Sequence, residues 1–439
     1  MALGGILIPM DWLILVLGIP AILIPLVLLF GFAGCGPPAA TNCTGDADCP
    51  IGTQCGADGL CRAAGEPDSP PPSAPDSLAA NALDDQSVFL AWHNNEPAAA
   101  DVSFEIERTP ENGDPVVFPV QANLSPTGAA SVTDAGLELE EGVTFIYRVR
   151  AVLGEQHSEF SDSNESRATV FPLAPAGLAA TPASINQIDL RWTNVSRHAT
   201  RFSLERRDPG GTFAEIFSGD VPTNSYSDPS LAEGTTYDYR VFAIVVDGVQ
   251  NDIPGPVKSA PATVSATTLA FTAAFTAPPG TLTNDALGNQ GTCLVQRLSR
   301  TLLAAGGTQV RIVLRGPNTG GLTLDRVAIS RVSTAAGGDP YDAAPDRTDV
   351  ASAVIIPANS LVTVGPVNYT LDPTQDLLVA FDISNTPGQG DLIQGPLTGA
   401  DTFASRPPPP LAEAGVPDRT SGYQSIPGFL FLVEKIEVL

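Results

Sequence analysis

The chain repeats itself after about one hundred residues, and this repeat limits the possible folds more than any other feature of the sequence. Four landmark residues of the first copy recur in the same order in the second. They are Pro75, Leu78, Leu90 and Trp92, matched by Pro175, Leu178, Leu190 and Trp192. The stretches SVFLAWHN and QIDLRWTN alternate apolar and polar residues around the tryptophan, which is typical of half-buried strands. The repeat therefore predicts two successive domains of similar structure.

Each copy continues with further short segments in which apolar and polar residues alternate. FEIER in the first copy is matched by FSLER in the second, and LELEEGVTFIYRVRAV is matched by LAEGTTYDYRVFAI. The 41 glycines and 41 prolines of the chain favour many turns and short strands over long helices. Short strands at this spacing, with turn residues between them, predict that each copy folds as a β-sandwich.

The two copies resemble fibronectin type III domains, over residues 74–171 and 172–268. The resemblance implies that Trp92 and Trp192 are the inward-facing tryptophans of strand B. In this family the sheets supply stability and the loops supply any binding, so we expect the two domains to act as spacers. No Arg-Gly-Asp tripeptide occurs in the sequence, and an integrin-style contact therefore has no support.

A second pattern of this family, a leucine six residues before an aromatic residue, occurs in both copies. It is met by Leu139 with Phe145 and by Leu231 with Tyr237. The resemblance implies that these residues pack at a corner of each sandwich. Because Phe145 has no hydroxyl group to bond to the backbone, we expect the first domain to be less stable by about 1 kcal/mol.

Residues 269–439 form a third, different unit that is also rich in β-structure. Its alternating and β-branched segments predict roughly eight or more strands in a jelly-roll-like sandwich. These segments are QVRIVLRG, LTLDRVAISRV, SAVIIPA, SLVTVGPVNYTL, DLLVAFDIS and FLFLVEKIEVL. The length of the last one favours an inner position in a sheet. The longest loop is expected from Gly388 to about Tyr423. Its proline run at 407–410 is either an exposed polyproline II helix that a partner protein binds or part of a solvated loop.

The order of these segments is similar to that of accessory β-sandwiches beside some bacterial serine esterases and of carbohydrate-binding modules. The similarity is one of pattern rather than of motif. The esterase motifs are missing, since neither a G-D-S block nor G-x-S-x-G occurs. A sugar platform favours exposed tryptophan or tyrosine, and this unit has no tryptophan and only Tyr341, Tyr369 and Tyr423.

The N-terminal residues 12–33 carry no charge, and as a helix they would span about 33 Å, enough for the roughly 30 Å hydrocarbon core of a bilayer. We expect 1–36 to be a retained single-pass anchor with its N-terminus in the cytoplasm. Small residues would allow close packing against other membrane helices; they are Gly18, Ala21, Gly31 and Ala33.

Two alternatives to a retained anchor stay open for this N-terminal segment. One is a cleaved signal peptide, although a basic n-region is missing, and the other is a lipoprotein cleaved before Cys35, since FAGC resembles a lipoprotein box.

Four cysteines at six-residue intervals, CTGDADCPIGTQCGADGLC, define a small module at 37–62. The module is too short and polar for a hydrophobic core, so we expect two disulfides and an oxidising compartment. Cys43, Cys49, Cys55 and Cys61 allow three connectivities, of which we favour Cys43–Cys55 with Cys49–Cys61. A zinc site would need closer cysteine pairs. The D-x-D pattern in this module lacks the downstream glutamate of a calcium loop.

A proline-rich linker is expected at 63–73, extended as polyproline II, so that it holds the following domain away from the membrane. Two cysteines remain outside the module. Either Cys35 and Cys293 pair with each other or Cys293 is simply buried, as single cysteines commonly are.

No sequence pattern supports catalysis. His93, His157 and His198 lie far apart, and no phosphate-binding loop, H-E-x-x-H or haem-attachment motif occurs. We therefore predict a protein that is not an enzyme and that has no cofactor, no metal and no small-molecule substrate. The net charge of −26, from 22 basic and 48 acidic residues, disfavours nucleic acid as a partner.

These observations together predict a non-catalytic, single-pass accessory subunit of a bacterial membrane complex. It would brace or dock other subunits on the periplasmic side of the inner membrane, with integral membrane subunits and membrane lipid as partners. Among complexes that recruit single-helix subunits, we rank photosynthetic reaction centre–light-harvesting assemblies before respiratory supercomplexes, although no motif selects either. The alternative is a cell-surface adhesin or polysaccharide-binding protein with the C-terminal sandwich as its binding head.

Overall fold

The computed structural model describes residues 42–56, 59–63, 71–96, 101–160, 165–286, 290–335, 337–386, 391–405, 412–419 and 422–439. This part of the chain is all-β, as predicted, apart from two short 3-10 helices, η1 (Asp46–Asp48) and η3 (Arg300–Leu302). No helix within these ranges has the length and apolarity that a membrane span requires. Several predicted features lie outside the described residues: the segment 12–33 with Gly18, Ala21, Gly31 and Ala33, then Cys35, most of the linker 63–73, and the proline run 407–410.

The chain divides into two compact units, Met1–Pro72 and Ser73–Leu439. In the first, β1 (Thr53–Cys55) and β2 (Cys61–Ala63) form an antiparallel hairpin. Two disulfides, Cys43–Cys55 and Cys49–Cys61, connect the hairpin to the preceding turns. Ile51 is fully exposed, so the module has no apolar core at this position and depends on its covalent links.

The acidic residues of this module hold its turns together. Asp46 Oδ1 accepts the backbone N–H of Cys55 at 2.8 Å, and Asp48 Oδ2 accepts both the N–H and the hydroxyl of Thr44, at 2.9 and 2.8 Å. The sulfur atoms of Cys43, Cys49 and Cys55 lie within 4.8 Å of one another, but each is part of a disulfide. Such sulfurs offer no thiolate to a metal ion.

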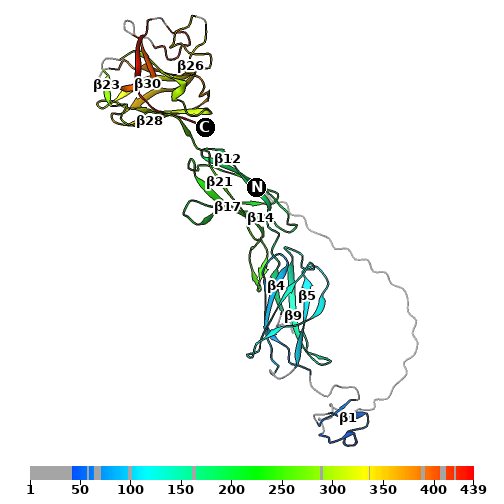
Figure 1. Ribbon diagram of the computed structural model, residues 1–439. Helices are drawn as coiled ribbons and strands as arrows, with labels where there is room; N and C mark the ends of the chain where they lie inside the picture. The colour runs from blue at the N-terminus through cyan, green and yellow to red at the C-terminus, as the bar shows by residue number, and fades with distance from the viewer. Residues whose placement is uncertain are drawn as a thin grey trace, which may run out of the picture. The chain divides into compact units, whose positions relative to one another are not determined.

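The first repeat copy forms a sandwich of two antiparallel sheets, here named sandwich 1 (Figure 1). One sheet has the order β3 (Asp76–Ala82), β4 (Ser87–His93), β8 (Ala129–Ala135), β7 (Asn123–Leu124). The other contains β11 (Glu165–Thr169), β9 (Thr144–Leu153), β5 (Val102–Pro110) and β6 (Val116–Val120), with β10 (Gln156–His157) paired to β9. Alternate residues of β4, β5 and β9 face inward and form one apolar core.

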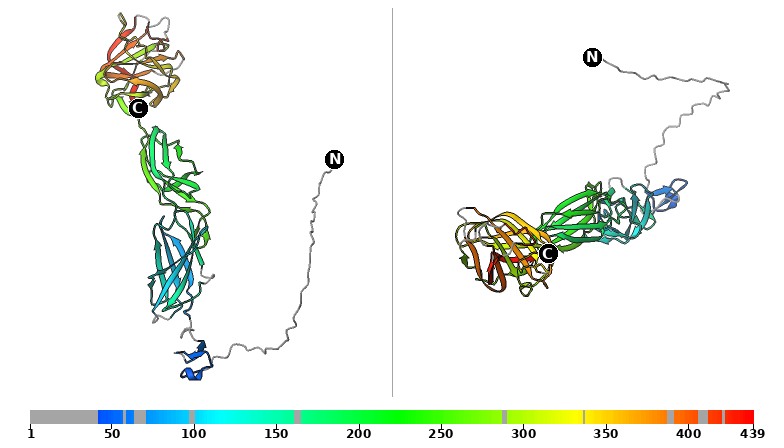
Figure 2. Two further views of the ribbon diagram at one scale, coloured as in Figure 1. Left: turned by 90° about the vertical axis from the view of Figure 1, so that its right-hand side faces the viewer. Right: turned by 90° about the horizontal axis from the view of Figure 1, so that it is seen from above.

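The second copy forms sandwich 2, the green part of the ribbon in Figure 2. Its smaller sheet has the order β12 (Ala176–Ser184), β13 (Gln187–Thr193), β16 (Ser225–Asp228). The larger sheet contains β15 (Phe213–Asp220), β14 (Arg201–Arg207), β17 (Thr236–Val245), β20 (Val257–Lys258) and β21 (Ala262–Thr267). A separate core lies between the two sheets. The hairpin of β18 (Val249–Gln250) and β19 (Ile253–Pro254) leaves sandwich 2 and pairs with β11 of sandwich 1.

The C-terminal sandwich packs a four-stranded sheet on a seven-stranded one. The four-stranded sheet has the order β22 (Thr272–Thr276), β32 (Val433–Val438), β25 (Gly307–Arg315), β28 (Leu361–Leu371). The seven-stranded sheet has the order β23 (Asn284–Ala286), β30 (Leu392–Ala404), β24 (Cys293–Leu298), β29 (Leu377–Ile383), β26 (Leu322–Arg331), β27 (Thr348–Ile356), with β31 (Gln424–Phe431) paired to β30. The largest apolar core of the described residues lies between these sheets.

The loop predicted from Gly388 to Tyr423 is wrong over part of its length, because β30 lies within it. The glycines and proline of LIQGPLTGADTFA suggested a turn-rich segment. The structure accommodates them at a register shift between Pro396 and Asp401, where β30 leaves regular pairing with β31. Gly395 is required here for a packing reason, since a β-carbon would collide with the carbonyl oxygen of Thr281.

The final segment, FLFLVEKIEVL, was predicted as one strand and is in fact two. The chain changes sheet at Leu432, whose φ of 54° breaks the extended conformation. β31 therefore ends in the seven-stranded sheet, and β32 enters the four-stranded sheet between β22 and β25. The predicted inner position is thus correct for β32 alone.

Reduction of the disulfides should unfold residues 42–63 and leave the three sandwiches folded. Each disulfide closes a separation of 12 residues and is expected to contribute about 2–4 kcal/mol in a segment without a core. Hydrogen–deuterium exchange with and without reductant would measure this for each segment of the chain. Unchanged protection of the module after complete reduction would contradict its dependence on the disulfides.

Candidate functional site

The strand-B tryptophans and the corner residues Phe145, Leu231 and Tyr237 lie in the cores of the two repeat sandwiches. The exposed fraction is between 3% and 7% for each of Trp92, Phe145, Trp192, Leu231 and Tyr237. Each tryptophan packs edge-on against a phenylalanine of the facing sheet, Trp92 on Phe104 and Trp192 on Phe202. The ring centroids are 5.1 and 5.7 Å apart. These contacts are those of packing and provide no binding site.

The corner aromatic residues differ between the copies. Tyr237 Oη accepts the backbone N–H of Ala232 at 2.9 Å, which closes the turn before β17. Phe145 has no hydroxyl, and its ring lies 5.8 Å from the guanidinium carbon of Arg108. Sandwich 1 therefore lacks one hydrogen bond that sandwich 2 has at this corner.

A buried ion pair with a tyrosine joins the two sheets of sandwich 1. Arg108 Nη1 donates to both carboxylate oxygens of Asp134 at 3.0 Å, and Tyr147 Oη donates to Asp134 Oδ2, also at 3.0 Å. Arg108 and Tyr147 come from β5 and β9, whereas Asp134 comes from β8 of the facing sheet. All three side chains are buried, so the carboxylate is fully engaged inside the core.

Sandwich 2 contains the same arrangement at equivalent positions. Arg206 Nη1 donates to Asp228 at 3.0 and 3.1 Å, and Tyr239 Oη donates to Asp228 Oδ2 at 2.8 Å. Burial, and then the neighbouring aspartate, raises the pKa of Tyr147 and of Tyr239 above the ordinary value. Both tyrosines therefore stay neutral and act as donors. These triads were not predicted from the sequence, although both arginines end, and both tyrosines lie within, segments that recur in the two copies.

The junction between sandwiches 1 and 2 depends on Glu141, in the turn before β9. Its Oε2 accepts the hydroxyl of Ser196 at 2.7 Å and the backbone N–H of Leu173, in the linker, at 3.2 Å. Its Oε1 accepts the N–H of Arg197 at 2.6 Å. Both oxygens of one carboxylate thus connect sandwich 1, the linker and a loop of sandwich 2.

The β18–β19 hairpin adds a second set of contacts to this junction. Gln250 Oε1 accepts the N–H of Ala82 at 2.8 Å, and Gln250 Nε2 donates to the carbonyl oxygen of Thr169 at 2.6 Å. Asp252 Oδ1 accepts the N–H of Arg167, and its Oδ2 accepts the hydroxyl of Ser166, both at 2.9 Å. Because β3 and β11 both contribute partners, the hairpin covers the edge between the two sheets of sandwich 1.

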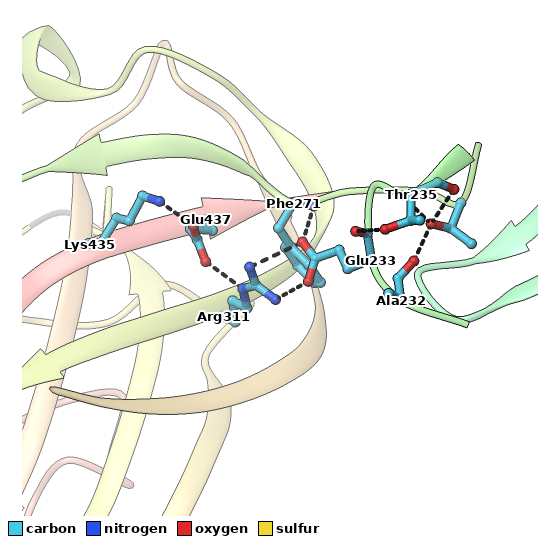
Figure 3. Close-up of polar contacts among 8 residues, drawn as sticks. Ala232, Glu233, Thr235, Phe271, Arg311, Lys435 and Glu437 are labelled. Atoms are coloured by element: carbon cyan, nitrogen blue, oxygen red, sulfur yellow. Dashed lines mark hydrogen bonds and ion pairs between the residues drawn. The ribbon is translucent and has the colours of Figure 1, made fainter. Parts of the chain in front are cut away.

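The junction between sandwich 2 and the C-terminal sandwich depends on Glu233 (Figure 3). Glu233 Oε1 accepts the backbone N–H of Phe271, in the linker, at 2.8 Å. Arg311 of β25 donates to Glu233 Oε2 at 2.7 Å and to Oε1 at 3.2 Å, and its guanidinium carbon lies 4.3 Å from the centre of the Phe271 ring. Arg311 also donates to Glu437, which in turn pairs with Lys435. One arginine therefore joins two sandwiches and their linker.

Glu141 and Glu233 occupy equivalent positions, since each precedes the glycine of a Glu-Gly turn in LEEG and LAEG. Those glycines have φ of 70° and 59°, where other residues are strained, and a β-carbon on Gly142 would collide with His198 of sandwich 2. The same turn thus provides the contact with the following domain at both junctions. From the sequence these segments were predicted only as strands, and their role at the junctions was missed.

Partial burial by itself would raise the pKa of Glu233, but hydrogen bonds from Arg311 and Phe271 outweigh burial and lower the pKa below its ordinary value. Glu437 has the same balance, with Arg311 and Lys435 as the groups that lower its pKa against the effect of burial. Both carboxylates are consequently ionised at neutral pH, as these contacts require.

The histidines and Cys293, the free cysteine of the described ranges, lie in structural environments. His93, His157 and His198 each lie within 4 Å of a carboxylate oxygen, of Asp76, Glu105 and Glu140 respectively. Cys293 is fully buried, and burial raises the pKa of its thiol to about 12, so it is not a nucleophile at neutral pH. Within the described ranges, no histidine–nucleophile pair appears among these contacts.

Comparisons with known proteins give limited further information. No protein-family model matches the chain. The chain is 27% identical over 290 residues to exoglucanase B of Cellulomonas fimi. The aligned region covers 65% of this chain and 23% of that protein, so the chain spans about a quarter of that relative's length. The two-domain fibronectin type III segment of chicken tenascin aligns with a TM-score of 0.30 at 16% identity, covering 45% of this chain and 100% of that one.

The chicken interferon gamma receptor alpha chain aligns with a TM-score of 0.27 at 16% identity, covering 45% of this chain and 98% of that one. These TM-scores are too low to identify the fold. The strand order identifies it instead, because in each copy three neighbouring strands of one sheet face four strands of the other. These strands are β3-β4-β8 and β11-β9-β5-β6 in sandwich 1, and β12-β13-β16 and β15-β14-β17-β21 in sandwich 2. The predicted fibronectin type III-like sandwiches are therefore confirmed at the level of the fold.

Replacing the triad aspartate should destabilise each sandwich strongly. Asp134→Asn leaves Arg108 buried with a neutral acceptor and with the exposed Glu138, at 2.9 Å from Nη2, as its carboxylate partner, and we expect a loss of about 3 kcal/mol in the unfolding free energy of sandwich 1. Tyr147→Phe should cost only about 1 kcal/mol, because it removes one neutral donor.

Because the chain has several domains, hydrogen–deuterium exchange of peptides from sandwich 1 is a better measurement than one global melting curve. Asp114→Asn, at an exposed position of the same sandwich, is the matched control. Equal effects of Asp134→Asn and Asp114→Asn would show that the triad contributes no stability.

Proposed function

We propose that the chain is a non-catalytic spacer and docking protein, in which two fibronectin type III-like sandwiches hold the C-terminal sandwich in a fixed orientation. The observation that carries this proposal is the repeated use of Glu141 and Glu233 to bond the linker and the next domain. A flexible tether would need neither the paired hydrogen bonds nor the hairpin that covers the edge of sandwich 1. Domains joined by small polar interfaces move relative to one another by default, so the proposal rests on these charge-assisted hydrogen bonds and on the hairpin to hold the orientation.

In this proposal the uncharged segment 12–33 anchors the chain in a membrane, and the sandwiches lie outside the cytoplasm. The two disulfides of the N-terminal module support an oxidising location. The partners would be membrane subunits that need a β-domain held at a defined place. Nothing in the described residues favours a photosynthetic assembly over another membrane complex, so the proposal specifies none.

Polysaccharide binding is the second candidate function, because the relative in Cellulomonas fimi is by name an exoglucanase. The C-terminal sandwich has an open pocket of about 420 Å³ beside β26 and β28. Planar and hydroxyl groups of the kind that bond to sugars surround it; they are Arg331, Asp346, Thr348, Asn368, Tyr369, Thr370 and Asp372. Tyr369 is buried and donates to Asp346 at 3.1 Å, so its ring offers no stacking surface.

The spacer proposal predicts a narrow distance distribution between sandwich 1 and the C-terminal sandwich. Fluorophores attached through non-natural amino acids at the exposed positions 112 and 352 of the full chain would measure it by single-molecule energy transfer. Glu141→Gln and Glu233→Gln should each broaden the distribution, since an amide keeps only one acceptor oxygen. We expect each to cost about 1–2 kcal/mol in closing its junction.

Glu155→Gln, in an exposed turn of sandwich 1, is the matched control and should leave the distribution unchanged.

Lowering the pH should broaden the distance distribution in the same way as Glu233→Gln. Because the folded pKa values of Glu233 and Glu437 are lowered, their contribution is complete above the ordinary glutamate pKa of about 4.3 and is lost as the pH falls through the lowered values. A broad distribution in the unmodified chain at pH 7 would contradict the spacer proposal.

The polysaccharide candidate predicts that soluble β-glucan retards the full chain in affinity gel electrophoresis. Asn368→Ala removes an exposed amide at the pocket and should weaken the retardation about fivefold, the value of one typical hydrogen bond. Asn112→Ala, an exposed amide in sandwich 1, is the control. Migration that is independent of glucan concentration would exclude this function for the glucan used and leave the spacer proposal unaffected.

A further inference from the structure

Strand β16 of sandwich 2 has an open edge where its counterpart in sandwich 1 is covered. In sandwich 1, β8 pairs with β4 on one side and with β7 on the other, where Asn123 lies opposite Ser131 and Leu124 opposite Ala130. In sandwich 2, β16 pairs with β13 and ends the strand order β12-β13-β16. Among the strands that the structure describes, none pairs with its other edge.

The difference has a cause in the length of the chain before each strand. Residues 121–128 connect β6 to β8 and include β7, whereas only residues 221–224 connect β15 to β16. The connection in sandwich 2 is half as long and leaves no residues for a covering strand. The open edge is therefore a consequence of the sequence of the second copy.

The open edge presents backbone groups that are ready to pair. Trp192 N–H donates to the carbonyl oxygen of Asn224 at 3.0 Å, which makes this pair a hydrogen-bonded one. Since the pattern alternates along an antiparallel ladder, the N–H and C=O groups of Tyr226 face β13, and those of Ser225 and Ser227 face away from it. In sandwich 1, Ser131, which corresponds to Ser225, uses these groups to pair with β7.

A polar groove with an available cation runs along this edge. Its volume is about 720 Å³, against about 400 Å³ at the equivalent place in sandwich 1. Arg191 lines it, is exposed and lies directly across from Ser225, and no ion pair of Arg191 occurs among the described residues. The nearby Asp189 is already bonded by the side chains of Gln187 and Ser227, which lower its pKa more than the charge of Arg191 does. Sandwich 1 has Ala91 in place of Arg191, so the charge is specific to sandwich 2.

We propose that the open edge of β16 binds an extended, acidic polypeptide segment of a partner protein, which adds to the sheet as one antiparallel strand. We expect the bound segment to pair with β16 as β7 pairs with β8 in sandwich 1. The residue of the segment that takes the place of Asn123 would then lie opposite Ser225. A carboxylate at that position lies two strands, or about 10 Å, from the backbone of Arg191, and the arginine side chain can reach it across the small Ser225. Backbone bonds supply the affinity and Arg191 supplies the preference for an acidic residue.

The test uses the full chain in detergent and labelled octapeptides whose sequence follows residues 120–127, VQANLSPT. The acidic peptide VQAELSPT should bind more tightly than VQANLSPT, and VQAKLSPT more weakly, by fluorescence anisotropy. Hydrogen–deuterium exchange should show new protection at 223–229. Arg191→Ala should weaken the acidic peptide about two- to fivefold, as an exposed ion pair allows, whereas Arg201→Ala, an exposed arginine of the opposite sheet, should not.

Two changes test the strand pairing itself. Ser225→Pro removes an outward N–H at an edge position, where proline is tolerated, and should abolish binding. N-methylation of the glutamate in VQAELSPT blocks pairing from the peptide side and should have the same effect without any change to the protein. Absence of protection at about 1 mM acidic peptide, or equal binding of the lysine peptide, would overturn the proposal. Protection of 223–229 that rises with protein concentration alone would identify a second copy as the occupant and would also overturn it.

Discussion

A glutamate that accepts backbone N–H groups across a linker is the interaction on which the arrangement of the second compact unit depends. Glu141 and Glu233 each use both carboxylate oxygens, and each bonds to its linker as well as to the next domain. A carboxylate in this role costs less to desolvate than one facing an apolar surface, because it exchanges water for strong donors. The sandwiches can therefore remain acidic and hydrated and still be held against one another.

A comparison of the two sandwiches distinguishes the residues that stabilise the fold from the residues that differ between the copies. Both copies keep the core tryptophan, the Arg–Asp–Tyr triad with its buried aspartate and tyrosine, and the glutamate of the Glu-Gly turn. They differ at the corner aromatic, at the strand that covers β8, and at the position occupied by Ala91 in one copy and Arg191 in the other. The shared features stabilise a sandwich and join it to its neighbour. The differences at the covering strand and at Arg191 lie on one edge of sandwich 2 and change what that edge can contact.

The sequence predicted the features that depend on local periodicity, and missed those that depend on contacts between distant segments. Alternation around Trp92 and Trp192 was sufficient to predict two sandwiches, because side-chain period and burial are coupled in strands. β30 was missed because its glycines and proline are typical of turns, and only its pairing with β24 and β31 shows why they are tolerated. The triads and the junction glutamates were missed for a related reason. Their partners are distant in sequence, 13 positions apart for Tyr147 with Asp134 and 78 for Arg311 with Glu233, and a charged residue in a chain of net charge −26 carries no local sign of its partner.

The distribution of cations explains why the open edge of β16 stands out from the rest of the surface. Most described arginines are already paired with a carboxylate, including those of both triads and of the junction at Glu233. Arg191 is one of the few described arginines for which no such ion pair occurs, although acidic residues outnumber basic ones in the chain. Asp189, which lies in the same strand as Arg191, is engaged by the neutral side chains of Gln187 and Ser227. An incoming acidic strand would supply the missing carboxylate and the missing backbone partners together, so charge and strand pairing favour the same occupant.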